Sequence, residues 1–160
     1  MKLFLSIFSP LLCFVILGAH LSHLISVWDN IPSSISLMYS GENPNQTGSK
    51  LLLFLLPVLT VILWIFLQFL RSIRKKFNYI NLTEENKVSQ YNAMNMMLIS
   101  IQTLSFVGLM CINEAFLRNT LELNARLFET SAIILLVLCV VPPLIIAIWA
   151  RTSFKEKRTL

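Results

Sequence analysis

The stretch LLLFLLPVLTVILWIFLQFL fills residues 51–70 and contains no charged side chain. A helix needs roughly 20 apolar residues to cross about 30 Å of hydrocarbon, because each residue adds about 1.5 Å to its length. Residues 51–70 meet this requirement, so we predict a membrane-spanning helix here. The fold class then depends on how many further stretches of this kind the chain contains.

Three more stretches qualify, at residues 3–27, 93–112 and 131–150. Of the 160 residues, 56% are hydrophobic and only 13% are charged, which excludes an ordinary soluble core. We therefore predict an all-α, integral membrane four-helix bundle that forms a single domain over residues 1–160.

The first of these stretches also has some features of a signal peptide. Lys2 precedes an apolar run, and Ala19 is a small residue that could stand before a cleavage site. Leu17, however, is bulky where a second small residue is needed, and the apolar character continues to Val27. We expect the first helix to be retained.

Lysine and arginine are unevenly distributed between the predicted loops. The N-terminus, the loop at 71–92 and the tail at 151–160 hold 10 of them, whereas the loops at 28–50 and 113–129 hold 3. Cytoplasmic loops of membrane proteins carry the excess of these residues. We therefore predict that both termini are cytoplasmic and that the other two loops are outer loops. The net charge of +5 then reflects topology, and we expect no nucleic-acid partner.

The first outer loop, residues 28–50, is rich in turn-forming Pro, Gly, Asn and Ser. It is long for a connector between adjacent spans, and long loops are often functional. We predict that it is a recognition surface. The candidate residues are Pro32, Gly41, Glu42 and Lys50.

Four basic residues follow the second span: Arg71, Arg74, Lys75 and Lys76. We expect them to hold anionic lipid headgroups, with a specific lipid or partner site as the alternative. Further along this loop, Thr83 and the two carboxylates after it predict a helix start near Glu84. The third helix would then run from near Glu84 to about Ile112.

Polar residues inside the predicted spans are expected to face other helices, because polar groups are costly in lipid. One side of the third helix carries Asn92, Asn95, Gln102 and Ser105, and one side of the second carries Thr60 and Gln68. We predict a hydrogen-bonded seam between these helices, with a substrate path as the alternative. No Asp, Glu, Lys or Arg lies deep within a predicted span, which argues against an ion-coupled transporter.

Proline interrupts two of the predicted spans. Pro57 lies in the second span, and Pro142 and Pro143 lie in the fourth. Each removes a backbone donor, so we predict kinks at both places. Such kinks either frame a cavity or are purely structural.

His20 and His23 are the two histidines, and their spacing places them on one face of the first helix. A metal site would need further ligands, for which Asp29 and Glu114 are the nearest plausible carboxylates. We favour hydrogen bonding at the membrane interface over metal binding.

The second outer loop carries charges of alternating sign at four-residue intervals. These are Glu114, Arg118, Glu122 and Arg126. We predict that they form a solvated, self-paired face, either on an interfacial helix or on two helix ends that project from the membrane.

The motifs of common enzyme classes are missing. The sequence has no HExxH, no GxSxG, no phosphate-binding loop and no dinucleotide fingerprint. We therefore predict that the protein is not an enzyme and has no cofactor.

Two segments resemble a known family. They are Ile31-Pro32 through Leu55-Leu56-Pro57, and Phe77-Asn78-Tyr79 through Gln90-Tyr91. Together they cover roughly residues 27–92 and resemble the bacterial membrane family called domain of unknown function 1648. That domain also forms the N-terminal part of the immunity proteins against the sporulation-delaying toxin. The resemblance implies four helices, a bacterial cytoplasmic (inner) membrane and no established enzymatic activity.

The sequence departs from this family in the first outer loop. Family members have a second Pro followed by a His and an aromatic residue, where this chain has Ser36, Leu37, Met38 and Tyr39. The resemblance therefore transfers no role to that position. It does not transfer immunity function either, because the chain lacks the additional C-terminal helices of those proteins.

Three functions remain in competition. We favour a non-enzymatic subunit that binds another membrane protein, as an accessory, sensor or immunity-type component, with membrane lipids as its other partner. The second is a small transporter or lipid-handling protein that uses the kinked helices and the polar seam. The third is a metal or cofactor protein built on His20 and His23.

Overall fold

The computed structural model describes residues 2–36 and 47–153, and it describes side chains from residue 6 onward. The candidates Gly41 and Glu42, and the tail from residue 154, lie outside the described residues. In chain order, the elements are α1 (Lys2–Ser26), η1 (Trp28–Asn30), β1 (Ser34–Ser36), β2 (Thr47–Ser49), η2 (Lys50–Phe54), α2 (Leu55–Ser72), η3 (Arg74–Lys76), α3 (Lys87–Thr120), α4 (Arg126–Leu138) and α5 (Val141–Ser153).

Among the described residues, four helical segments are long and apolar enough to cross a membrane. They are Ser6–Ser26, Lys50–Ser72, Lys87–Thr120 and Arg126–Ser153. The predicted all-α class with four such helices is therefore confirmed. Each segment overlaps one predicted span, because hydrophobic length is a local property of the chain.

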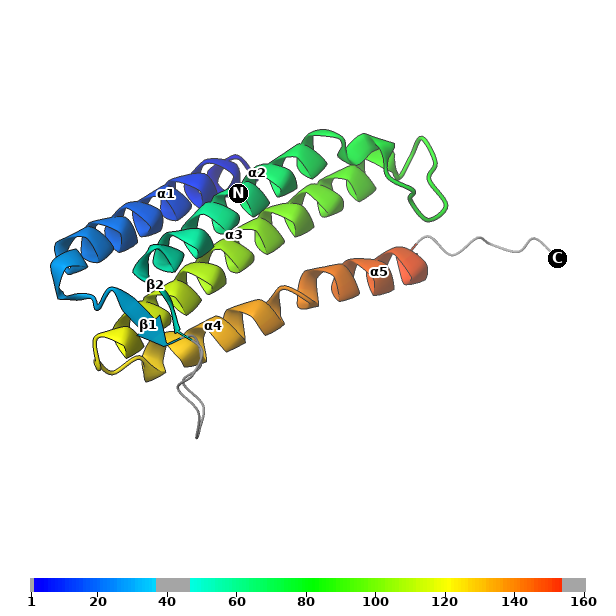
Figure 1. Ribbon diagram of the computed structural model, residues 1–160. Coiled ribbons are helices and arrows are strands. Elements are labelled where there is room, and N and C mark those ends of the chain that lie inside the picture. Colours follow the sequence, from blue (N-terminus) through cyan, green and yellow to red (C-terminus); the bar gives the residue numbers. More distant parts are fainter. Residues whose placement is uncertain (1, 37–46, 154–160) are drawn as a thin grey trace.

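The helix α3 is the centre of the bundle. It packs against α1, α2, α4 and α5, with α1 and α2 on one side and α4 and α5 on the other (Figure 1). In the most apolar 18-residue window of each segment, 39% of the residues are buried in α3, against 6% in the α4–α5 segment. The other helices are thus held together mainly through α3.

The C-terminal end of the predicted third helix is wrong, whereas its start is close to the predicted one. The α-helix begins at Lys87, directly after a turn over residues 84–86. The Thr83 N–H donates to Asn86 Oδ1 at 2.9 Å, and the Lys87 N–H donates to the Thr83 carbonyl at 2.9 Å, as expected near a helix start. The helix ends at Thr120 and thus continues beyond Ile112. The polar residues after Ile112 do not end the helix, because they find partners on other helices.

The prolines act differently in the two segments. Pro142 and Pro143 stand in the first turn of α5, and the fourth segment is broken between α4 and α5, as predicted. Pro57 stands in the first turn of α2, after the 3-10 helix η2. A proline is well tolerated in the first turn of an α-helix. The Leu53 carbonyl, four residues before Pro57, accepts a hydrogen bond from the Asn113 side chain of α3 instead. Pro10 also lies within α1, and we made no prediction for it.

The described parts of the loop between α1 and α2, residues 28–36 and 47–49, pack on the helix ends. Its strands β1 and β2 are antiparallel, with Ser34 opposite Ser49 and Ile35 opposite Gly48. The buried side chains beneath them form one cluster: Leu24, Ile31, Ile35, Leu53 and Leu117. We call this end of the bundle the ribbon end, and the end that carries residues 71–87 the basic end.

Candidate functional site

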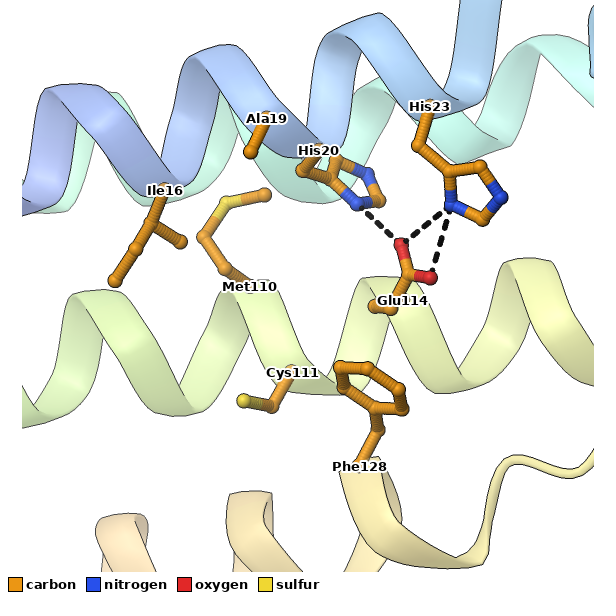
Figure 2. A pocket seen from close by; sticks show the side chains of 8 residues that line it. All are labelled: Ile16, Ala19, His20, His23, Met110, Cys111, Glu114 and Phe128. Carbon is orange, nitrogen blue, oxygen red and sulfur yellow. Dashed lines mark hydrogen bonds and ion pairs between the residues drawn. The ribbon is translucent and has the colours of Figure 1, made fainter. Parts of the chain in front are cut away.

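Three side chains donate hydrogen bonds to the carboxylate of Glu114, near the ribbon end. Figure 2 shows the two from α1, His20 and His23. His20 Nδ1 lies 2.9 Å from Oε2. His23 Nδ1 lies 3.0 Å from Oε1 and 3.2 Å from Oε2. Arg118 Nε lies 2.8 Å from Oε1. The two histidines come from successive turns of α1, whereas Glu114 and Arg118 lie one turn apart on α3.

The neighbouring Asn113 fixes the tautomer of His20. Asn113 Nδ2 donates to the Leu53 carbonyl at 3.0 Å and lies 2.6 Å from His20 Nε2. An amide nitrogen has only donor hydrogens, so Nε2 must be the acceptor. We therefore assign the proton of His20 to Nδ1, from which it is donated to Glu114. A buried chain of hydrogen bonds thus joins α1 and α3 to η2, at the start of the second segment.

The cluster also reaches α4 through Arg118. The guanidinium carbon of Arg118 lies 4.6 Å from the centre of the Phe128 ring. Cation–π contacts of this kind are attractive and are strengthened when water is excluded. The cluster, which we call the His–Glu cluster (His20, His23, Asn113, Glu114 and Arg118), therefore connects all four apolar segments at the ribbon end.

The predicted solvated face of alternating charges is wrong. Glu114 is buried, with 8% of its surface exposed, and it lies inside α3. Glu122 stands in the turn between α3 and α4 with a φ of 57°, and Arg126 begins α4. Only Glu114 and Arg118 pair, and the segment consists of two helix ends, one of the two arrangements that we considered.

A cavity of about 250 Å³ opens beside the His–Glu cluster. Its polar residues are His20, His23 and Glu114, and Figure 2 shows them at one end. Its other lining residues are Ile16, Ala19, Met110, Cys111 and Phe128. Such a site can hold an apolar group with a hydrogen-bonding end, but the carboxylate already accepts from three side chains. The described residues contain no group of three His, Cys, Asp or Glu side chains that could hold a metal ion.

Sequence reasoning named His20, His23 and Glu114 but missed Asn113. Asn113 follows Gln102 by 11 residues, which places it about 20° away around a helix at about 100° per residue. The signal was present, but it requires the helix to continue past Ile112. Asp29, the other carboxylate considered beside the histidines, is exposed in η1.

The polar residues of α2 and α3 form part of the predicted seam. Gln102 Nε2 donates to the Trp64 carbonyl at 3.0 Å, and Arg71 Nε donates to Asn95 Oδ1 at 2.9 Å. Thr60 is buried but donates to Leu56 in its own helix. The remaining candidates, Ser105 and Gln68, make only long contacts of 3.4 Å with Gln102 and Arg71. Sequence reasoning missed a hydrogen bond between the hydroxyls of Ser9 and Thr103, which joins α1 to α3.

The four predicted headgroup-binding residues do not act alike. Lys75 and Lys76 are exposed, whereas Arg71 is half-buried and bonds to residues of three helices. Arg74 donates to the Arg71 carbonyl at 2.8 Å, and Tyr79 donates to the Arg74 carbonyl at 2.6 Å. Burial and the neighbouring Tyr91 raise the pKa of Tyr79, so its hydroxyl stays protonated and remains a donor at neutral pH.

Two candidates of the loop between α1 and α2 can be placed. Pro32 is exposed. Lys50 is half-buried, with Nζ 3.2 Å from the Trp28 carbonyl and 4.5 Å from the centre of the Trp28 ring. Lys50, at the start of η2, thus holds the two ends of the loop together through Trp28 of η1. Its side chain is less available to a partner than that of Pro32.

No family model, no curated protein and no solved structure matches this chain. The resemblance of residues 27–92 to domain of unknown function 1648 therefore stays a prediction.

Proposed function

We propose that this chain is a non-enzymatic membrane protein of four spans that binds another membrane protein through its ribbon end. In this proposal both termini are cytoplasmic, the ribbon end faces outward, and the membrane is a bacterial inner membrane. The role is that of an accessory, sensor or immunity-type subunit. The observation that supports it is that the described parts of the connection between α1 and α2, residues 28–36 and 47–49, are packed on the helix ends; we call them the platform.

The platform is fixed by an apolar core beneath it. Ile31 is 3% exposed and Ile35 is 2% exposed, and both pack among residues of α1, η2 and α3. The Trp28 ring packs on Phe54, with their centres 5.2 Å apart. A loop that only connected two helices would not need to bury such side chains. A preformed surface loses less conformational entropy on binding than a flexible loop does.

The polar residues below the platform hold the helix ends that carry it. Leu53, in the platform core, is tied by its carbonyl to Asn113 of the His–Glu cluster. Pro32, Ser33 and Ser34 are exposed above that core. We propose that this exposed side of the platform is the contact surface.

The proposal is tested by site-specific photo-cross-linking. A photoreactive amino acid at Ser34 should capture a defined membrane protein in cells, whereas the same amino acid at exposed Lys75 of the basic end should not. Ile35→Ala should weaken the capture at Ser34, because it removes a buried anchor of the platform. Ile133→Ala, at a position 65% exposed on α4, is the matched control and should leave the capture unchanged.

A second candidate function, the transport of a small solute, is favoured by one observation. Glu114 lies within an apolar helix and beside a cavity, whereas the sequence analysis assigned no ionisable residue to a span interior. Buried ionisable residues in membrane helices are often part of ion or solute paths. Absence of any capture at Ser34, Pro32 and Ser33 would contradict partner binding at the platform and would shift the assignment to transport.

A further inference from the structure

The guanidinium of Arg71 is held between three helices by neutral groups. Nε donates to Asn95 Oδ1 of α3 at 2.9 Å, and Nη2 donates to Ser6 Oγ of α1 at 2.6 Å. Nη1 makes a longer contact of 3.4 Å with Gln68 of its own helix α2. These contacts fix the position of the positive charge but do not neutralise it.

No carboxylate pairs with Arg71 among the residues that the structure describes. Its neighbours Arg74, Lys75 and Lys76 are also positive, and the nearby pair of Lys87 with Glu84 is exposed and self-contained. A partly buried charge is costly unless an opposite charge approaches it. Arg71 is therefore a partly buried charge without a counter-ion among the described residues.

Arg71 has donors left for an anion. A guanidinium carries five N–H groups, and three of them are used by Asn95, Ser6 and Gln68. One N–H remains on each terminal nitrogen. Two N–H groups in this forked arrangement match two oxygens of a phosphate.

An apolar cavity lies further along the same pair of helices. It has a volume of about 230 Å³ and lies between α1 and α2, with Phe106 of α3 among its lining residues. Its other lining residues are Cys13, Phe14, Leu17, Val61, Trp64 and Ile65. Cys13 follows Ser6 by seven residues, and Trp64 precedes Arg71 by seven. Seven helical residues span about 10 Å, so the cavity begins about 10 Å from the guanidinium, toward the middle of the bundle.

We propose that Arg71 and this cavity together bind one anionic phospholipid. The phosphate lies against the free N–H groups of Arg71, and one acyl chain runs between α1 and α2 into the cavity. The spacing fits, since the polar headgroup layer of a bilayer is about 5 to 8 Å thick on each side. The surplus of positive charge at Arg74, Lys75 and Lys76 favours a headgroup with net negative charge over a zwitterionic one.

Native mass spectrometry of the full chain in mild detergent tests this proposal. Titration with phosphatidylglycerol should show one retained lipid per chain, with clearly weaker retention of phosphatidylcholine. Arg71→Gln should reduce the apparent affinity for phosphatidylglycerol about tenfold or more, the amount expected for lost charge-assisted hydrogen bonds. Arg126→Gln removes an equal charge at an exposed position of the ribbon end, far from Arg71, and should change the affinity by less than about threefold.

Further variants separate the lipid from a free anion and from misfolding. Val61→Phe should fill the cavity and weaken lipid retention, whereas Ile62→Phe, at a position 55% exposed on the same helix, should not. Arg71→Lys keeps the positive charge but removes the paired N–H groups of the guanidinium, so it should bind phosphatidylglycerol with intermediate affinity. This variant tests the proposal if Arg71→Gln does not fold. Equal retention in Arg71→Gln and the unchanged protein would overturn the proposal. Displacement of the lipid by inorganic phosphate, with no effect of Val61→Phe, would show a free-anion site instead.

Discussion

Glu114 shows how a charged residue is kept within an apolar helix. Its carboxylate accepts hydrogen bonds from His20 and His23 of α1 and from Arg118 of α3. Burial of a carboxylate is costly by itself, and such donors offset the lost hydration. Replacement by the neutral amide would turn one acceptor oxygen into a donor that faces the N–H of a histidine.

The first prediction at this scale concerns the stability of Glu114→Gln. We expect the free energy of unfolding to fall by about 2 to 3 kcal/mol, because Arg118 loses its counter-ion and one histidine N–H loses its acceptor. Titration of the detergent-solubilised protein with sodium dodecyl sulfate measures this value. Glu122→Gln is the control, because Glu122 is exposed in the turn. This variant should change the free energy of unfolding by less than about 0.5 kcal/mol. Equal effects of the two variants would show that the cluster contributes no stability.

At the scale of elements, the fourth segment is divided by its two prolines. Pro142 and Pro143 have no N–H to donate, so the helical ladder cannot continue from α4 into α5. The Cys139 N–H is shared between the carbonyls of Leu135 and Leu136, both at 3.2 Å, as α4 ends. The break sets the direction of α5, which packs against α3 near the basic end.

We predict that Pro142→Ala combined with Pro143→Ala straightens the fourth segment. A change of about 20° at the start of α5 would displace Ile148, about 10 Å further along, by about 4 Å. Spin labels at Ile148 and Phe69, both exposed, report this displacement in a background with the three cysteines replaced by alanine. Pro32→Ala, outside the helices, is the control. An unchanged distance in the double variant would mean that packing on α3, rather than proline, sets the break.

At the scale of the whole molecule, basic residues are concentrated at one end. The basic end carries Arg71, Arg74, Lys75, Lys76 and Lys87, whereas the ribbon end carries Lys50, Arg118 and Arg126. Two of the three basic residues at the ribbon end are engaged, Arg118 by Glu114 and Lys50 by Trp28. The excess of available positive charge is thus at the basic end, which supports the proposal that this end faces the cytoplasm.

The orientation can be measured by labelling introduced cysteines with a maleimide that does not cross membranes. In the same cysteine-free background, Ser34→Cys should be labelled in intact cells. Lys75→Cys should be labelled only after the membrane is permeabilised. Both positions are exposed, so a difference reports their side of the membrane and not burial. The opposite pattern would invert the proposed topology.

The sequence by itself determined the four apolar helices and the break at Pro142 and Pro143. Both depend on neighbouring residues only: hydrophobic length is a sum along the chain, and proline removes its own N–H. The resemblance of residues 27–92 to domain of unknown function 1648 stays untested by the structure. Sequence reasoning also identified Gln102 as a residue that faces another helix, because its position on the third helix could be computed from the helical repeat.

The tertiary structure decided where α3 ends and which residues meet around Glu114. His20 and Glu114 are 94 residues apart, and Asn113 and Leu53 are 60 apart, so no local pattern connects them. Asn113 and Glu114 resemble loop residues in sequence because an unpaired polar group in lipid is costly. They lie inside a helix because distant segments supply their partners, and only packing brings those segments together. The burial of the loop residues Ile31 and Ile35 was hidden for the same reason, since the apolar surface that covers them belongs to three other elements.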